Sequence, residues 1–135
     1  MTKTLDPTRP INDNCGWEHV VTDLSTFHDY ADSEGMAERC ASIPSVLGKG
    51  KRMFLDGIHG GGGMYYEGSK HERGAPIMCT EFGGVNIASS VDKDQKENWG
   101  YTTAKDSEDL LKRVERIVMA TVKSGVVCGV VWTQL

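Results

Sequence analysis

The fold of this chain is decided by residues 74–84, which read Gly-Ala-Pro-Ile-Met-Cys-Thr-Glu-Phe-Gly-Gly. The apolar run from Ala75 to Cys79 predicts a short buried strand, and Glu81 follows two residues after it. The two glycines let the backbone bend away, so the carboxylate is expected at the lip of the strand. Enzymes of the α/β class present reactive acids in this way. A strand that simply ends in a charged turn is the alternative interpretation.

A helix and a second strand are predicted near the carboxyl end. Apolar residues recur at spacings of three and four from about Ser107 to Lys123, which predicts an amphipathic helix. Asp106 or Ser107 is expected to cap its start. The apolar run from Val126 to Val131 predicts a parallel strand buried on both faces. Strand, helix and strand form a βαβ unit, so the fold class is α/β.

The first half of the chain gives weaker signals. Two strands and a short capped helix are predicted there, near residues 10–13, 20–24 and 36–41. Residues 42–74 are rich in glycine and resist assignment, although residues 53–55 are compatible with one more strand. A loop of this length in a compact domain is usually a functional lid or contains a missed element.

Composition excludes several classes of partner. The chain is 39% hydrophobic and 25% charged, and its formal net charge of −4 argues against nucleic acid, because phosphate binding needs a basic surface. No apolar run approaches the length of a membrane span, and the amino terminus does not resemble a signal peptide. The four cysteines show neither paired nor metal-type spacing, which favours a reduced, cytoplasmic location. The four histidines also lack metal-ligand spacing, so neither a metal nor a cofactor is expected.

Four motifs resemble, in this order, the later part of the catalytic barrel of family 2 glycoside hydrolases, the β-galactosidase and β-glucuronidase group. They occupy residues 13–19, 26–30, 76–84 and 129–135. The Thr-Glu-Phe-Gly-Gly and Trp-Thr-Gln blocks are the most specific parts of a resemblance that covers nearly the whole chain. It implies a partial (β/α)8 barrel, with residues 1–135 supplying roughly strands five to eight and their helices. A full barrel needs about 250 residues, so this 135-residue chain is expected to be its carboxyl-terminal half.

The resemblance also implies a retaining glycosidase that acts on β-O-glycosidic bonds of a carbohydrate substrate. Such enzymes use two carboxyl groups about 5 to 5.5 Å apart, one as nucleophile and the other as acid/base. Glu81 matches the nucleophile. The Asn-Glu pair that supplies the acid/base in this family would lie on a strand before Met1. The chain alone is therefore expected to be inactive towards ordinary glycosides.

The same resemblance assigns substrate-binding residues. Tyr30 matches a tyrosine that donates a hydrogen bond to the nucleophile, which keeps the carboxylate ionised. His28 matches a pocket histidine that donates to sugar hydroxyls, and Trp132 matches an aromatic platform beneath the sugar ring. A structural role is the alternative for His28, and ordinary packing of core aromatics is the alternative for Tyr30 and Trp132. Further candidates for the rim and mouth of the pocket are Asp13, Trp17, Trp99 and Tyr101.

Two other functions stay open at this point. The chain is either a non-catalytic sugar-binding module or a half barrel that pairs with a complementary half or with its own copy, because a half barrel has open strand edges. The run of glycines after His59 resembles the oxyanion loop of lipases, but the chain lacks the Gly-x-Ser-x-Gly motif that accompanies it. We therefore expect a flexible loop there.

Overall fold

The computed structural model describes residues 2–33, 35–48, 52–87 and 101–133, and its centre is a parallel sheet. The sheet has three strands in the order β1-β4-β7, with bounds Ser25–Asp29 for β1, Ile77–Gly83 for β4 and Val127–Thr133 for β7. Both neighbours of β4 run parallel to it. The predicted α/β class with a parallel sheet is confirmed.

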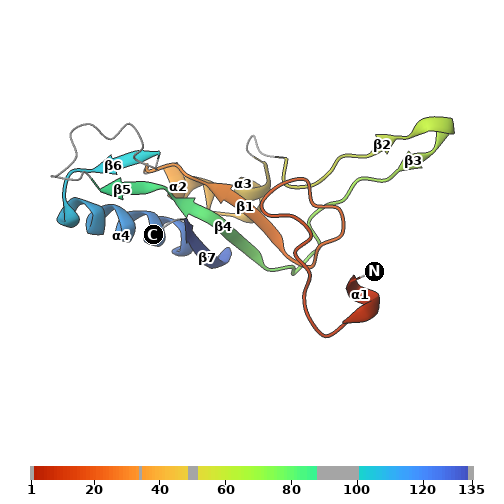
Figure 1. The fold of residues 1–135 in the computed structure, drawn as a ribbon, viewed down its shortest axis with the longest axis horizontal. Helices are drawn as coiled ribbons and strands as arrows, with labels where there is room; N and C mark the ends of the chain where they lie inside the picture. Colours follow the sequence, from red (N-terminus) through yellow and green to blue (C-terminus); the bar gives the residue numbers. More distant parts are fainter. Residues whose placement is uncertain (1, 34, 49–51, 88–100, 134–135) are drawn as a thin grey trace.

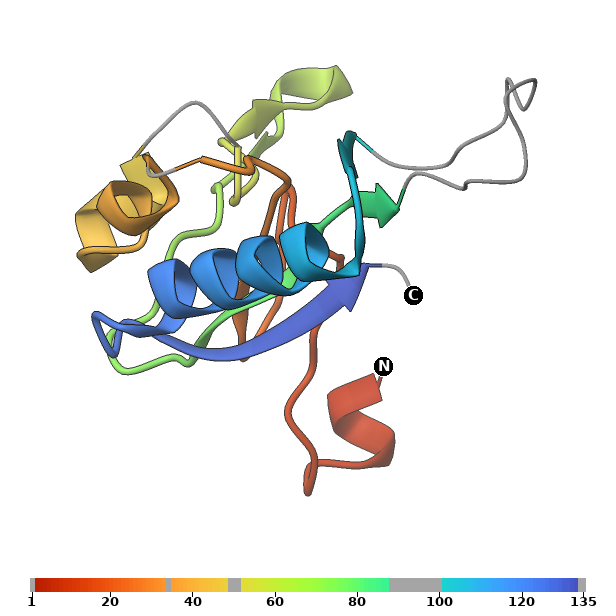
Figure 2. The same cartoon turned by 90° about the vertical axis from the view of Figure 1, so that its left-hand side faces the viewer.

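One face of this sheet is covered by helix α4, Ser107–Val122, which lies across the strands (Figure 2). The predicted cap is present: the Asp106 carboxylate accepts a hydrogen bond from the backbone N–H of Asp109 at 2.8 Å. The hydrophobic core lies between helix and sheet, and its members from these elements include Phe27, Ile77, Cys79, Phe82, Ile117 and Val127. No helix within the described ranges is long and apolar enough to cross a membrane.

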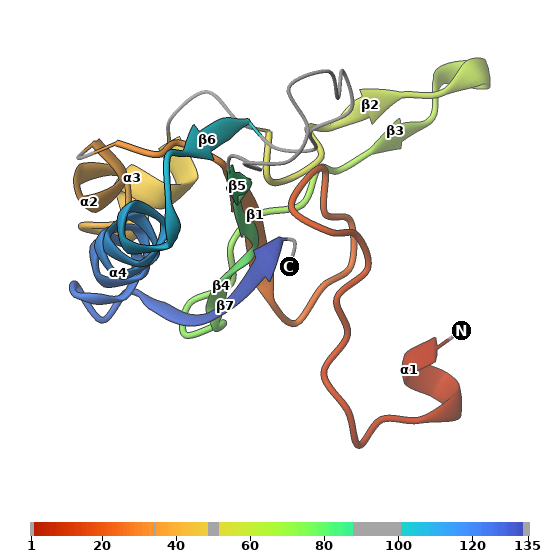
Figure 3. The same ribbon diagram turned by 60° about the vertical axis from the view of Figure 1, so that its left-hand side comes forward.

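Two short helices, α2 (Gly35–Arg39) and α3 (Ile43–Gly48), lie on the same side of the sheet as α4 (Figure 3). Residues 42–74 therefore contain a helix, and they also contain an antiparallel hairpin of β2 (Ile58–His59) and β3 (Tyr65–Tyr66). A single 3-10 turn, η1 (Gly61–Gly63), connects the hairpin strands. The hairpin projects away from the sheet at the end opposite to α4 (Figure 1).

The remaining elements are α1 (Thr2–Leu5) and a parallel pair formed by β5 (Val85–Ile87) and β6 (Thr102–Ala104). The strand predicted at residues 53–55 is reduced to a single bridge between Phe54 and His19.

Both strands predicted before residue 25 are wrong. Residues 10–13 form no strand, and the first strand of the sheet begins at Ser25 rather than at residue 20. Val20 and Val21 have the composition of a strand but are 56% and 60% exposed. Their backbone N–H groups donate to the side chain of Asp13, which satisfies them within a loop instead of a sheet.

The prediction that β7 is buried on both faces is also wrong. Val131 is 49% exposed and Cys128 is exposed. Helix α4 covers only one face, and β7 is an outer strand of the described sheet. Cys128 is in addition an extra residue, because Ile77 pairs with Val127 whereas Met78 pairs with Gly129.

We expect the ion pairs of Asp32 to be a main link between α4 and the loop after β1. Its carboxylate is 5% exposed and accepts hydrogen bonds from Arg113, at 2.8 Å, and from Arg116. Asp32→Ala should lower the free energy of unfolding by about 1–3 kcal/mol, because Arg116 and Arg113 both lose a charged hydrogen bond to Asp32, although Arg113 keeps its pair with Asp109. Urea unfolding followed by circular dichroism measures this.

Lys112→Ala is the matched control, since it removes an exposed helix pair with Glu108. Its effect should be about 0.5 kcal/mol or less. Equal losses in the two variants would contradict the role given to Asp32.

Candidate functional site

A β-bulge in β4 decides where the Glu81 side chain lies. Phe27 of β1 pairs with Cys79, but the next residue, His28, pairs with Glu81, so Thr80 is an extra residue. The register between β4 and β7 shifts at the same place. Side chains alternate along a strand, so without the bulge Glu81 would share the face of Cys79, beneath α4. The bulge turns Glu81 to the opposite face, beside His28.

Glu81 receives two contacts on this open face. The Tyr30 hydroxyl, directly after β1, donates to Oε2 of Glu81 at 2.6 Å. His28 Nδ1 lies 3.2 Å from the same oxygen. The Glu81 side chain is 34% exposed, whereas the His28 side chain is 11% exposed. Both contacts are made to Oε2. The second carboxylate oxygen of Glu81, Oε1, takes part in neither of them.

Tyr30 is held as a permanent donor. Burial raises the pKa of Tyr30 to about 12, and the hydrogen bond to Glu81 acts in the same direction. Tyr101 packs against the Tyr30 ring with 4.3 Å between ring centroids. Gly84, with φ +63°, makes room for both rings, since a Cβ atom there would lie 2.6 Å from Tyr101 and 2.9 Å from Tyr30. The phenol is therefore fixed in place and protonated at neutral pH.

Cys15 extends the cluster on the other side of the imidazole. Its Sγ lies 3.1 Å from His28 Nε2 and 3.4 Å from the hydroxyl of Thr80. Gly16 underlies the ring, since a Cβ atom there would lie 2.3 Å from His28 Cδ2, and its φ of +83° also favours glycine. The Trp17 ring meets His28 edge-on at 5.7 Å. The imidazole thus touches a thiol through one nitrogen and a carboxylate through the other.

Trp132 lies at the same carboxyl edge of the sheet. It pairs in register with Phe82, and the two rings meet edge-on with centroids 5.2 Å apart. Gly83 lets the indole approach the backbone, because a Cβ atom there would lie 2.8 Å from the ring. The side chain is half-buried. Glu81, Tyr30 and Trp132, which the family resemblance assigns to one sugar-binding site, therefore lie at the same edge of the sheet.

Asp13 is not brought into this cluster. Its carboxylate accepts hydrogen bonds from the N–H groups of Val20, at 2.6 Å, and Val21, at 2.8 Å, and lies 2.7 Å from Nδ1 of the fully buried His19. Desolvation is the largest single effect on the pKa of Asp13 and raises it, but the hydrogen bonds together outweigh it and leave the pKa lowered. The Asp13 carboxylate thus stabilises the loop in which it lies, by binding residues 19–21. Trp99 lies outside the described residues.

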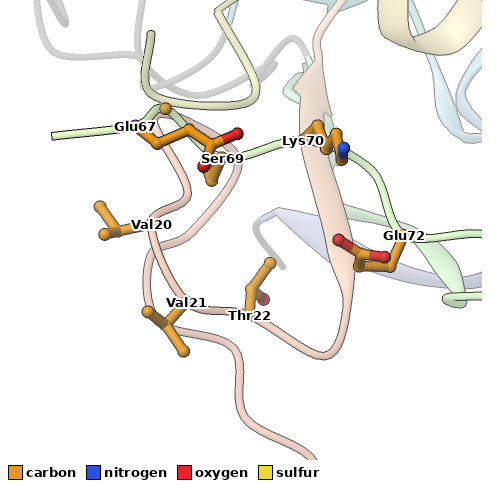
Figure 4. Close-up of a pocket in the computed structure, with 8 residues that line it drawn as sticks. Val20, Val21, Thr22, Glu67, Ser69, Lys70 and Glu72 are labelled. Carbon is orange, nitrogen blue, oxygen red and sulfur yellow. The ribbon is translucent and has the colours of Figure 1, made fainter. Parts of the chain in front are cut away.

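A pocket of about 420 Å³ lies away from these residues. It opens between the loop Val20–Thr22 and residues 67–72 (Figure 4). Both segments precede strands of the sheet, β1 and β4, so the pocket belongs to the amino edge. Reactive groups in parallel α/β folds gather at the carboxyl edge. We therefore assign the candidate site to the cluster around Glu81 and not to this pocket.

Sequence reasoning gave no role to Cys15 or Thr80. Cys15 is the third residue of the first motif, but its spacing to other cysteines and histidines carries no signal. One ligand atom from each of Cys15, His28 and Glu81 lies within 4.8 Å of the others, and these residue types bind zinc. Sulfur and carboxylate, however, face different nitrogens of one imidazole. The arrangement fits proton transfer through His28 better than a single shared ion.

No protein-family model matches the chain, and no curated protein is significantly similar to it.

The raised pKa of Tyr30 predicts a loss of stability at alkaline pH. An unfolded tyrosine ionises near about pH 10, whereas Tyr30 in the fold has a pKa of about 12. The contribution of the protonated Tyr30 to the free energy of unfolding is therefore complete below about pH 10, and it is lost as the pH rises through about 12. Tyr30→Phe should flatten the fall of the unfolding free energy in this window, measured by urea unfolding at stepped pH.

Tyr65→Phe provides the control, because the Tyr65 side chain belongs to the projecting hairpin and is 59% exposed. This variant should keep the slope of the unmodified chain. A Tyr30→Phe slope indistinguishable from that of the unmodified chain would show that the fold does not protect this phenol.

Proposed function

We propose that the chain supplies the nucleophile side of the active site of a retaining β-glycosidase related to glycoside hydrolase family 2. The observation that carries the proposal is the hydrogen bond from Tyr30 to Glu81 at the carboxyl edge of a parallel sheet. The resemblance in sequence implies this pair, and the two residues are 51 positions apart in the chain. A chance charged turn after a strand would not require such a partner.

In this proposal Glu81 attacks the anomeric carbon through Oε1. Tyr30 and His28 hold Oε2, and hydrogen bonds of this kind favour the ionised carboxylate that a nucleophile must be. They also fix the orientation of the attacking oxygen, which favours a productive geometry. Trp132 is the candidate surface for the apolar face of the sugar ring, since pyranose rings pack on aromatic side chains.

Following the family resemblance, we propose that the general acid comes from polypeptide outside this chain. Nearby acidic side chains are already engaged: Asp13 holds its loop, Asp29 pairs with Arg39 at 2.5 Å, and Glu18 pairs with Arg52 at 2.8 Å. A general acid typically contributes about 10² to 10⁴ in rate. Hydrolysis of unactivated glycosides by the 135-residue chain alone is therefore expected to be negligible.

We further propose that the sheet corresponds to strands six to eight of a (β/α)8 barrel. Three observations support this: the strands are parallel and follow one another in chain order, α4 covers one face, and the opposite face carries the polar cluster. In a barrel of this type helices lie outside, and reactive residues project at the carboxyl ends of the strands. The loop of residues 10–24 would then stand at the place of the fifth strand.

Covalent labelling tests the nucleophile without requiring the missing acid. A 2,4-dinitrophenyl 2-deoxy-2-fluoro-β-glycoside has a leaving group that needs no protonation, so it should leave one glycosyl group on Glu81. Galactoside, glucuronide and mannoside forms of the probe cover the sugars of the group. Intact mass and peptide mapping measure the label, and Glu81→Gln should abolish it because the amide is not nucleophilic.

Glu72→Gln is the matched control, since Glu72 is exposed and lies at the amino edge. It should be labelled like the unmodified chain. A label on another residue, or none with any of the three sugars, would contradict the assignment of Glu81. Robust turnover of alkyl glycosides by the chain alone would contradict the proposal that the general acid comes from outside the chain.

The open edge of β7 also predicts self-association, as the half-barrel hypothesis requires. Val131 is 49% exposed on the face away from α4, and outer strands offer unpaired backbone groups to other chains. Val131→Lys should weaken association about tenfold, because a charge on an edge strand opposes pairing. Light scattering coupled to size exclusion, over a range of concentrations, measures it.

Leu111→Lys places the same charge on α4, where Leu111 is 67% exposed. This control should leave association unchanged. A monomer at every concentration in the unmodified chain would rule out the self-pairing version of the hypothesis.

A further inference from the structure

We propose that Cys15 is a nucleophilic thiol, served by His28 as base with Glu81 orienting the imidazole, and that this thiol is modified by small neutral carbon electrophiles such as α-haloamides. This inference goes beyond the glycosidase and does not depend on it. The thiol reaction needs only residues that the structure describes, so a failure of glycosyl labelling would not affect it.

The contacts form a continuous relay. Cys15 Sγ lies 3.1 Å from His28 Nε2, and His28 Nδ1 lies 3.2 Å from Glu81 Oε2. A nucleophile, a base within reach of its proton and an acid on the far nitrogen of that base are the three parts of an activated nucleophile. The carboxylate favours the tautomer with the proton on Nδ1, which leaves Nε2 as the acceptor facing sulfur.

Packing holds this relay in place. The backbone of Gly16 lies beneath the imidazole. The Trp17 ring meets the imidazole edge-on, with 5.7 Å between the ring centroids. His28 sits beside the bulge that turns Glu81 towards it. The thiol itself is exposed, whereas the base behind it is buried. A small electrophile from solvent therefore meets sulfur first, and the imidazole lies on the protein side to receive the proton.

The reaction balances without a further reagent. With iodoacetamide, Sγ attacks the methylene carbon, a carbon–sulfur bond forms, the carbon–iodine bond breaks and iodide leaves. The thiol proton moves to His28 Nε2, and the resulting imidazolium pairs with the Glu81 carboxylate until solvent removes the proton. No oxidant, reductant or metal takes part.

The four cysteines allow an internally controlled test. Cys15 and Cys128 are exposed, whereas Cys40 and Cys79 are buried. Within the described part of the chain, the Cys128 thiol has no imidazole among its hydrogen-bond partners; it lies 3.3 Å from the carbonyl oxygen of Ile77. With iodoacetamide at pH 7 and peptide mass spectrometry, Cys15 should react at least about tenfold faster than Cys128. In urea the two rates should become equal.

His28→Gln should reduce the Cys15 rate to about that of Cys128 and leave Cys128 unchanged. The two buried cysteines report on folding, because they become reactive only if a variant unfolds. Should His28→Gln unfold, Glu81→Gln is the second variant: it keeps the side-chain size, removes the charge and should slow Cys15 severalfold. A native Cys15 rate close to that of Cys128, or a folded variant of either residue with an unchanged Cys15 rate, would overturn the proposal.

Discussion

The position of Glu81 depends on one extra residue in the central strand. Thr80 has no partner of its own in the pairing with β1, and this bulge breaks the alternation of side chains along β4. Before it, Cys79 points into the core beneath α4, and after it Phe82 returns there. Glu81, between these two core residues, is turned to the open face. A regular strand would bury a carboxylate against the apolar core, at a cost of several kcal/mol.

The bulge also divides the sheet into two chemically different faces. The face beneath α4 is apolar and provides the core, and the opposite face gathers hydroxyl, imidazole, thiol and carboxylate groups around Glu81. Rings can approach the backbone here only because glycine occupies positions 16, 83 and 84, each with positive φ. The two faces also differ in the environment that they give to a cysteine thiol. Burial raises the pKa of Cys79 to about 12, which makes its thiol inert at neutral pH, whereas Cys15 lies beside an imidazole.

Local sequence determined the elements whose stability is local. The helix α4 begins at the predicted cap and ends one residue before the predicted end, because capping, periodicity and the terminal glycine all agree. The strand β7 lies close to its predicted range, since a long apolar run between turns has few alternatives. The strand β4 runs four residues beyond the predicted end at Cys79, so Glu81 lies within the strand and not after it. The edge shared by Glu81, Tyr30 and Trp132 followed from the parallel strand order that a βαβ unit requires.

Tertiary structure decided what local patterns do not encode. Val20 and Val21 have the composition of a strand, yet the carboxylate of Asp13 takes their N–H groups, so the strand begins five residues later. The bulge at Thr80 is set by pairing with both neighbouring strands, and no periodicity within β4 shows it. Cys15 meets His28 only when the loop before β1 folds back over the sheet. Sequence therefore determined which reactive groups exist and at which edge they gather, and long-range backbone pairing decided which of them touch.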